Sequence, residues 1–322
     1  MNATQSSGSG HSITAIRWLT FLMFTMFAMT TDSVGVIIPV ILKDFHLSMM
    51  AAGSFHYAPM TAIGIAAILF GFMAVRLGRK PTILIGLSLF ALNSYLFAVG
   101  NSFALFLVLL IISGISIGIF KTGALALIGD ISRSTVDHTS TMNTVEGFFG
   151  VGAIIGPAIV ALLLSQGVSW KYLYVIAGTL CMILILIAAL TKYPKRTGEQ
   201  TPMNLGHTLK MTCNPFAFSF SMGIFLYVGV ETAIYVWMPT LLTGYSGPKL
   251  LMWRRRMRFR FFSCCAQVDV FLVHWFSDIF RGRGCSRFSP EPFFSALQAR
   301  CSARRMWPWS GTLRLGPPLD KL

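Results

Sequence analysis

The sequence predicts an all-α membrane protein: a six-helix bundle, then a seventh spanning helix, with the second half of the molecule incomplete. Three observations lead to this fold class. Hydrophobic residues make up 54% of the 322 residues and charged residues only 11%, whereas a soluble domain carries about 25% charged residues. The mean hydropathy is +0.67, and the apolar residues come in runs long enough to cross a bilayer. The Lys and Arg residues gather in alternate connections between those runs.

Seven apolar runs reach the length of a spanning helix, about 20 residues, because a helix rises about 1.5 Å per residue and the hydrocarbon core is about 30 Å thick. In chain order they are residues 17–42, 52–75, 82–100, 103–128, 142–165, 171–191 and 216–243. The first run is too long, and its flanks too plain, for a cleaved signal peptide. Short connections make sequential helices antiparallel neighbours. We therefore expect one bundle over residues 13–191.

The remaining segments differ from the bundle in composition. Residues 1–12 are rich in Ser and Gly and are expected to be disordered. Residues 192–215 contain prolines and charges and are expected to link the bundle to the seventh helix, 216–243. Residues 249–322 form a basic tail with 14 Lys/Arg against 4 Asp/Glu, whereas residues 1–248 hold 12 against 7. Four of the six cysteines lie in this tail, and the spacing predicts neither a disulfide framework nor a metal site.

The distribution of Lys and Arg predicts the orientation in the membrane. Nine of these residues fall on one side of the alternating topology: Arg17, Arg76, Arg79, Lys80, Arg133, Lys192, Lys195, Arg196 and Lys210. Only Lys43 and Lys171 fall on the other side. By the positive-inside rule, the N-terminus and the 192–215 linker are expected to be cytoplasmic.

The connection between the second and third spans carries a motif. It reads Gly71-Phe72-Met73-Ala74-Val75-Arg76-Leu77-Gly78-Arg79-Lys80-Pro81. A tight turn would hold two antiparallel helices there, and its cations can meet helix C-terminal carbonyls and the anionic inner leaflet. The segment closely resembles the signature loop of the major facilitator superfamily, G-x-x-x-D-R-x-G-R-R/K. The matching residues are Gly71, Arg76, Gly78, Arg79 and Lys80. The resemblance implies a role in conformational switching, with the family's charge relay weakened because Val75 replaces its Asp.

The fifth span also resembles this superfamily. It contains Glu146 at its start, glycines at positions 152 and 156, and Pro157 after the second of these. The pattern is similar to the family's fifth helix, in which a Gly-Pro pair kinks the helix and small residues four apart allow close packing. Drug antiporters carry a related motif. The alternative for most of these glycines is a purely structural role in tight helix packing.

The seventh span resembles one branch of the superfamily. Residues 225–232, which contain Glu231 and Thr232, are similar to the fucose/glucose–proton symporters. That branch also carries a Glu-Thr pair in span four, where this chain has Lys121 and Thr122. The resemblance implies twelve spans in two similar halves, with the substrate site at their interface and alternating access between them. Lys121 departs from the branch pattern and leaves the substrate and the coupling chemistry open.

Four ionisable residues lie within the apolar runs: Asp32, Lys121, Glu146 and Glu231. Such residues are costly in lipid, so they usually face a bundle interior and mark a pathway. In the superfamily, spans one, four and seven surround a central cavity, which matches three of the four positions. We hypothesise that Asp32 or Glu231 gains and loses a proton during transport. The alternative is a structural Asp32–Lys121 pair that only holds helices in register. For Glu146 we expect an interfacial or gating pair.

The expected cavity residues are Asp32, Lys121, Thr122, Glu231, Tyr227, Tyr235 and Trp237. The three aromatic side chains could stack on a sugar, with Asn143 as a further polar candidate, or could pack or lie at the membrane interface. The expected switching residues are Gly71, Arg76, Gly78, Arg79, Lys80, Asn143, Glu146, Gly156 and Pro157. His56 stands alone, without a partner for a metal site.

The tail is compatible with a wrong reading frame. One set of permitted codons for residues 258–269, read one nucleotide earlier, encodes A-V-S-V-F-F-V-L-R-A-G-R. That product is an apolar helix followed by a turn similar to the counterpart of the Arg76–Lys80 loop in the second half. We therefore hypothesise a frameshift near residues 247–249. Within the tail, residues 259–280 are at best a weak further span.

These observations predict a secondary active transporter of a small polar solute, preferably a sugar or a sugar-like molecule, coupled to protons. We expect a monomer that crosses the bacterial inner membrane several times and binds no cofactor. The alternatives are a non-transporting truncated remnant, or a multidrug or organic-anion antiporter of the same fold. No nucleophile, metal or phosphate-loop pattern supports an enzyme, and the basic tail has no nucleic-acid-binding motif.

Overall fold

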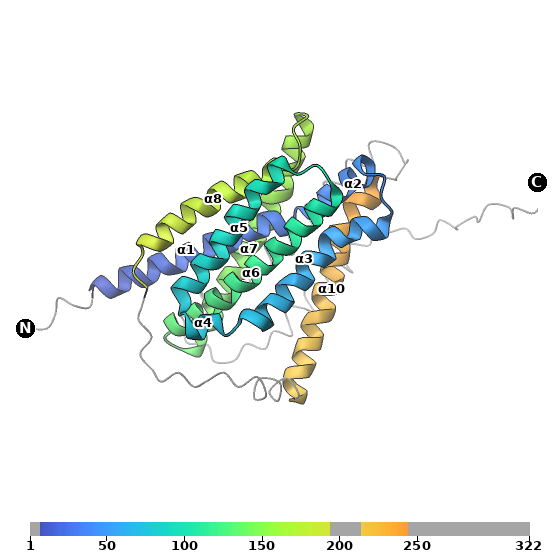
Figure 1. Cartoon of the computed structure of the whole chain (residues 1–322). Helices are drawn as coiled ribbons and strands as arrows, with labels where there is room; N and C mark the ends of the chain where they lie inside the picture. Colours follow the sequence, from blue (N-terminus) through green and yellow to red (C-terminus); the bar gives the residue numbers. More distant parts are fainter. Residues whose placement is uncertain (1–6, 194–213, 244–322) are drawn as a thin grey trace, which may run out of the picture. The chain divides into compact units, whose positions relative to one another are not determined.

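The computed structural model describes residues 7–193 and 214–243, which are drawn in colour in Figure 1. All described residues belong to one unit of the chain, residues 1–274. The expected basic tail, 249–322, lies outside the described residues, as do residues 1–6 and most of the 192–215 linker.

The described residues are helical, without strands. The helices are α1 (Ser7–Thr31), α2 (Val34–Asp44), α3 (Met49–Phe70), α4 (Met73–Arg76), α5 (Arg79–Val99), α6 (Phe103–Ile131), α7 (Thr135–Ser165), α8 (Tyr172–Leu190) and α10 (Pro215–Thr243). Seven stretches in this part of the chain are long and apolar enough to cross a membrane, with α1 and α2 together forming the first, Ile13–Asp44. The prediction of an all-α protein with seven spans is confirmed.

Local signals explain several helix boundaries. Ser48, Ser102 and Ser134 precede α3, α6 and α7, and each hydroxyl accepts a hydrogen bond from the backbone N–H three residues on. Such N-caps satisfy one of the backbone donors that a helix start leaves open. Before α5, Gly78 has φ +94°, which residues with a Cβ rarely adopt. This glycine therefore allows the tight reversal that was expected between the second and third spans.

The first six spans pack into one bundle. α3, α6, α5 and α8 follow one another as contacting neighbours, and α1 packs against α7 and α8 (Figure 1). Aromatic rings fill the interior: the ring centroids of Phe27 and Phe120 are 4.7 Å apart, and those of Phe97 and Tyr174 are 3.8 Å apart. These four side chains are fully buried. Because lipid is as apolar as these side chains, dispersion contacts between closely fitting surfaces hold the bundle together.

The glycines of the fifth span allow α7 to approach α1. A Cβ on Gly152 would collide with the backbone carbonyl of Thr25, and a Cβ on Gly156 would collide with the Met29 carbonyl and the Ser33 hydroxyl. Both helices present backbone to each other at these points. The close packing predicted from small residues four apart therefore exists.

The first span differs from the single helix that was expected, because the chain turns at Asp32 and Ser33 between α1 and α2. The Thr30, Thr31 and Ser33 hydroxyls donate to backbone carbonyls at Phe27 and Met29. Hydroxyl groups that bond the preceding turn compete with the regular ladder and bend helices. The bend places Asp32 where the backbone leaves the helical path.

Other boundaries also differ from the expected ones. α7 begins at Thr135 rather than at residue 142, since Ser134 caps a polar first turn. The second span ends at Phe70, and α4 forms a separate short helix before the signature turn. α1 begins at Ser7, so residues 7–12 are helical although a disordered segment was expected. The apolar run behind them extends the helix toward the N-terminus, because propagation adds a hydrogen bond for each residue fixed.

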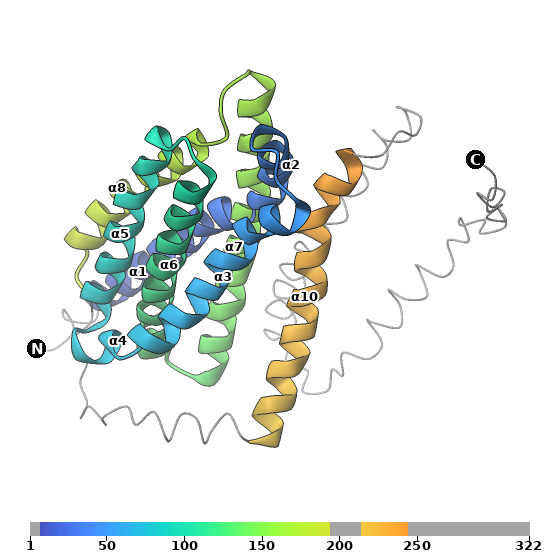
Figure 2. The same cartoon turned by 45° about the vertical axis from the view of Figure 1, so that its right-hand side comes forward.

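Helix α10 has few neighbours among the described residues. Its part nearest Thr243 contacts α2, whereas its other end stands apart from the remaining helices in Figures 1 and 2. Only 6% of its apolar window is buried. Gly35 of α2 marks the closest approach, where an added Cβ would lie 2.6 Å from the Tyr235 carbonyl oxygen. The seventh span is thus attached to the bundle through one of its halves.

Candidate functional site

The structure brings three of the expected cavity residues, Lys121, Glu231 and Tyr235, into electrostatic range of a fourth, Asp32. Asp32, at the break between α1 and α2, interacts electrostatically with Lys121 of α6 and with Glu231 and Tyr235 of α10. Lys121 also interacts with Glu146 of α7. These five residues, from four different spans, are called the charge cluster below. The bend in the first span and the attachment of α10 to α2 position the cluster.

Lys121 is held without a direct salt bridge. Its ammonium group lies 5.5 Å from the centroid of the Phe149 ring, within cation–π distance. In residues 7–193 and 214–243, only Arg17–Asp137 and Arg79–Asp130 form ion pairs within 4.0 Å. In this conformation Asp32 and Lys121 do not form the contact ion pair that the structural alternative requires. The electrostatic interaction between them therefore acts over more than 4.0 Å.

Two other expected cavity residues line the cluster less directly. Thr122 is half-buried, and its hydroxyl donates to the Ile119 carbonyl of its own helix at 2.7 Å. Tyr227 is 61% exposed and lies on the same helix as Glu231, with which it interacts electrostatically. Glu231 is itself exposed. The α10 side of the cluster is therefore open in the part of the chain that the structure describes.

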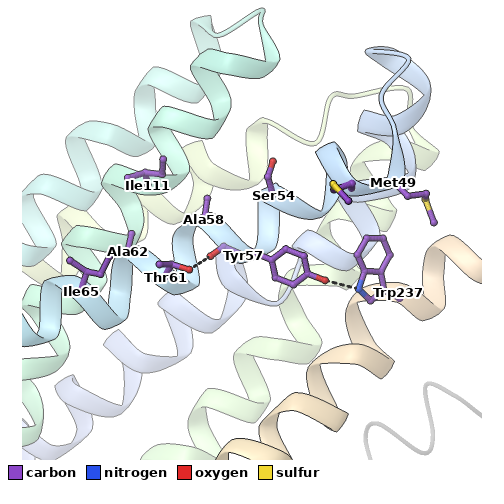
Figure 3. A pocket seen from close by; sticks show the side chains of 10 residues that line it. Met49, Ser54, Tyr57, Ala58, Thr61, Ala62, Ile65, Ile111 and Trp237 are labelled. Carbon is purple, nitrogen blue, oxygen red and sulfur yellow. Dashed lines mark hydrogen bonds between the residues drawn. The ribbon is translucent and has the colours of Figure 1, made fainter.

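Trp237 lies in a neighbouring groove instead of the charge cluster. Its indole Nε1–H donates to the Tyr57 hydroxyl at 3.3 Å (Figure 3). Its ring also lies against Gly53. The groove has a volume of about 750 Å³ and is lined by Met49, Met50, Ser54, Tyr57, Ala58, Thr61, Ala62, Ile65, Ile111 and Trp237. Its walls are almost wholly apolar, and the Ser54 and Thr61 hydroxyls bond backbone carbonyls of α3. The pairing of Trp237 with Tyr57 could not be read from the sequence.

The signature loop joins several helix ends. Arg79 donates to the Asp130 carboxylate at the end of α6 at 2.8 Å and to the Ala74 carbonyl of α4 at 2.7 Å. Lys80 donates to the carbonyls of Ala189 and Thr191 at the end of α8, at 2.7 and 2.9 Å. The loop cations were expected to meet helix C-terminal carbonyls, and two of them do.

The remaining loop positions make fewer polar contacts among the described residues. Arg76 is exposed, with its guanidinium 5.4 Å from the centroid of the Phe72 ring. Gly71 closes α3 with ordinary helical backbone angles. Val75, in place of the family's Asp, supplies no carboxylate. Asp130 pairs with the loop instead. The sequence signal that could have indicated it is its position directly after the predicted fourth span, as the single acidic residue of α6.

The other end of the first span carries a second ion pair that the sequence analysis missed. Arg17 donates to Asp137 at 2.6 Å, and the same carboxylate oxygen accepts the backbone N–H of Arg133 at 2.9 Å. Asp137 lies in the first turn of α7, where the helix dipole favours a carboxylate. The available sequence signal for this pair was that Asp137 lies at the same membrane face that was predicted for Arg17, the cytoplasmic one. The pair ties α1 to α7.

The expected switching residues of α7 occupy different environments. Gly156 is buried against α1 beside the bend, and Pro157 follows it within the continuous helix. Asn143 and Glu146 are exposed on the described surface. Glu146 takes part in the charge cluster through Lys121 and also interacts with Glu231. A gating pair for Glu146 stays a prediction.

No group of three or more His, Cys, Asp or Glu side chains among the described residues could hold a metal ion. His56 is buried between the rings of Tyr57 and Tyr235, and its Nδ1 has no hydrogen-bond partner in the described structure. Cys181 is buried as a free thiol.

Comparisons with known proteins place the chain among transporters. The model of the Major Facilitator Superfamily matches residues 20–279. The chain is 31% identical to the Quinolone resistance protein NorA of Staphylococcus aureus over 170 residues, 51% of this chain and 42% of that protein. It is 27% identical to Multidrug resistance protein 1 of Bacillus subtilis over 184 residues, 56% of this chain and 46% of that protein. The chain thus spans less than half the length of these curated relatives.

Two solved structures share the fold. A bacterial homolog of the human lysosomal transporter Spinster, in an inward-facing and unoccupied conformation, has a TM-score of 0.64 and 16% identity, covering 86% of this chain and 65% of that one. FucP, a transporter of the superfamily in the outward conformation, has a TM-score of 0.64 and 20% identity, covering 91% and 76%. At these identities the likeness shows the fold alone.

Proposed function

The chain belongs to the major facilitator superfamily, and on this premise we propose that it exports small aromatic organic solutes across a bacterial inner membrane in exchange for protons. The relatives NorA and Multidrug resistance protein 1 favour drug-like substrates over the sugar that the sequence analysis preferred. The charge cluster is the structural observation that supports the proposal. The multidrug antiporter, which the sequence offered as the last of its alternatives, therefore comes first.

The balance of charge in the cluster favours cationic or zwitterionic solutes. The cluster contains three carboxylates, Asp32, Glu146 and Glu231, and one cation, Lys121, so its formal charge is −2 when all four groups are ionised. An organic anion would meet net repulsion there. Aromatic rings from Tyr235 and Phe149 adjoin the charges, and ring faces attract organic cations. A sugar would need several free neutral hydrogen-bonding groups, yet the Thr122 hydroxyl already bonds its own helix.

The position of Asp32 suggests how a proton could act on the bundle. Asp32 lies at the bend between α1 and α2 and interacts electrostatically with Tyr235 and Glu231 on α10. Neutralising its carboxylate would weaken the attraction to Lys121 and change these interactions with α10. The same step would thus alter solute binding and the attachment of the seventh span. A proton that crosses the membrane potential supplies about 2.3 kcal/mol per 100 mV for such work.

The test measures accumulation of ethidium, an aromatic cation, in inside-out membrane vesicles with an imposed proton gradient. We expect the Asp32→Asn variant to lose gradient-driven accumulation by about tenfold or more, because the proton acceptor in the membrane is gone. Asp44→Asn is the matched control, since Asp44 is an exposed carboxylate at the end of α2, and it should keep normal accumulation. Unchanged coupling in Asp32→Asn would remove Asp32 from the proton-binding role.

A proton-coupled sugar symporter is the second candidate, and the similarity of residues 225–232 to the fucose/glucose branch favours it. Uptake of radiolabelled glucose or fucose into right-side-out vesicles, without ethidium export, would select it. The third possibility is a remnant that transports nothing. Vesicles containing the chain would then match empty vesicles for every solute, even though the protein is inserted.

A further inference from the structure

The antiparallel helices α5 and α8 each begin with a lysine that binds the end of the other. Lys80, in the first turn of α5, donates to the Ala189 and Thr191 carbonyls at the end of α8. Lys171, the N-cap residue of α8, donates to the Gly100 carbonyl at 2.8 Å, directly after α5. The same arrangement thus occurs at both ends of one helix pair.

A lysine at a helix start is unfavourable for that helix. The N-terminal end of the macrodipole is positive and prefers an acidic residue, whereas the C-terminal end is negative and leaves its last carbonyls without intrahelical donors. In this pair the cation of each helix lies against the open carbonyls of its antiparallel neighbour. Its charge therefore stabilises the neighbouring end, where it meets these open carbonyls.

The two ends differ in the aromatic ring that each lysine meets. After α8, Thr191 is extended, and its N–H still bonds the Ile187 carbonyl. Two residues on, the half-buried ring of Tyr193 packs against the interior cluster of α1, α5 and α6, with its centroid 5.5 Å from the Lys80 ammonium. Burial raises the pKa of Tyr193 to about 12, so the ring that faces the cation is neutral. The Lys171 ammonium instead lies 5.6 Å from the ring centroid of Phe106, which belongs to α6 and not to the chain just beyond α5.

We propose that Lys80 and Lys171 are reciprocal caps that fix the register of α5 against α8, and that Lys80 with Tyr193 also fastens residues 191–193 to the first bundle. The route from this bundle toward α10 therefore starts at Tyr193, three residues after α8 ends at Leu190. The proposal goes beyond transport, because it concerns how the chain leaves the bundle whatever solute is carried.

Trypsin cleavage after Lys192 tests the fastening. The full chain is purified in lipid nanodiscs, where both faces are accessible, and fragment masses separate the cut after Lys192 from the cuts after Lys195 and Arg196. Lys80→Met keeps the length of the side chain but removes the cation. We expect it to speed cleavage after Lys192 about tenfold relative to the other two cuts, because proteolysis follows the population of the opened segment. Lys80→Arg, which keeps a donor cation, should remain close to the unmodified protein.

Lys171→Met is the matched control, since it removes the equivalent contact at the opposite end of the same helix pair. It should leave the ratio of the cuts unchanged. Equal ratios in Lys80→Met and the unmodified protein would overturn the proposal, as would an equal rise in Lys171→Met. Should Lys80→Met not fold, Tyr193→Leu decides: loss of the ring face should raise the ratio about two- to threefold, and an unchanged ratio would overturn the fastening.

Discussion

Arg79 joins three parts of the bundle with one guanidinium group. It starts α5, bonds the Ala74 carbonyl of α4 and pairs with Asp130 at the end of α6. The superfamily pattern has an Asp at position 75, and in this chain Val75 leaves Asp130 as the carboxylate that Arg79 pairs with. A part of the loop's electrostatics therefore survives the replacement.

Replacing Asp130 should cost little stability, because the pair is partly exposed and such pairs contribute about 0–1 kcal/mol. We expect Asp130→Asn to lower the free energy of unfolding by at most about 1 kcal/mol. A double-mutant cycle with Arg79→Met, measured by denaturation in detergent micelles, gives the coupling between the two side chains. A coupling near zero would mean that Arg79 acts through the Ala74 carbonyl alone.

Close packing makes Gly152 a sensitive position. Its added Cβ would strike the Thr25 carbonyl, which is backbone and cannot turn away. We expect Gly152→Ala to destabilise the bundle by about 1–3 kcal/mol, the usual cost of overpacking. Gly64→Ala is the control, because a Cβ on Gly64 meets nothing within 4 Å. Thermal unfolding followed by tryptophan fluorescence should separate the two variants, and equal midpoints would contradict the close approach of α1 and α7.

At the residue scale, the sequence indicated which side chains matter better than it indicated their partners. Asp32, Lys121, Glu146 and Glu231 were identified because charge is rare in apolar runs. Their grouping required the bend between α1 and α2. The Trp237–Tyr57 bond and the Arg17–Asp137 pair join residues far apart in the chain, and no local pattern encodes such a distance.

Among the described spans, α10 contacts the fewest other helices, and Gly35 lies where it meets α2. A side chain at Gly35 would push against the Tyr235 carbonyl and the Val236 backbone. We expect Gly35→Val to separate this half of α10 from α2. The readout is short-span thiol cross-linking between cysteines placed at positions 57 and 237, whose native side chains are hydrogen-bonded.

The cross-linked fraction should fall about threefold or more in Gly35→Val, since a displaced helix leaves the reach of a short linker. Gly229→Val provides the control within α10, because a Cβ there meets nothing within 4 Å. A similar fall in both variants would indicate a general effect of valine on these helices instead of a specific contact.

The presence of the spanning helices could be predicted from hydrophobicity, because only helices and closed barrels satisfy the hydrogen bonds of backbone N–H and C=O groups in lipid. All seven expected spans are present. Their details depended on polar residues within or beside them. The hydroxyls of Thr30, Thr31 and Ser33 bend the first span, and Ser134 starts α7 seven residues before its apolar run. A hydropathy window averages over such side chains and cannot register them.

At the scale of the whole molecule, the orientation stays a prediction from the positive-inside rule. Single cysteines at Lys43 and Lys171 should react with a membrane-impermeant maleimide on intact cells, whereas cysteines at Arg76 and Lys192 should react only after permeabilisation. The six native cysteines are replaced first so that each signal has one source. The reverse labelling pattern would invert the topology and place the signature loop outside.

The nucleotide sequence of the gene can test why the second half of the molecule differs from the first. The expected frameshift near residues 247–249 concerns a tail outside the described residues, although the family match continues to residue 279. Sequencing the gene should reveal a second-half helix and an R-A-G-R turn in the neighbouring frame. Absence of an open neighbouring frame would remove this explanation for the composition of residues 249–322.

The one-sided attachment of α10 has a consequence for the life of the protein in a cell. Quality-control proteases of membranes extract helices that are weakly held by their neighbours. Within residues 7–193 and 214–243, α10 is such a helix, whereas the six preceding spans are interlocked by aromatic rings and glycine contacts. Degradation would therefore start at the seventh span and stall at the bundle. A long-lived fragment of six spans should be what immunoblots detect in ageing cultures.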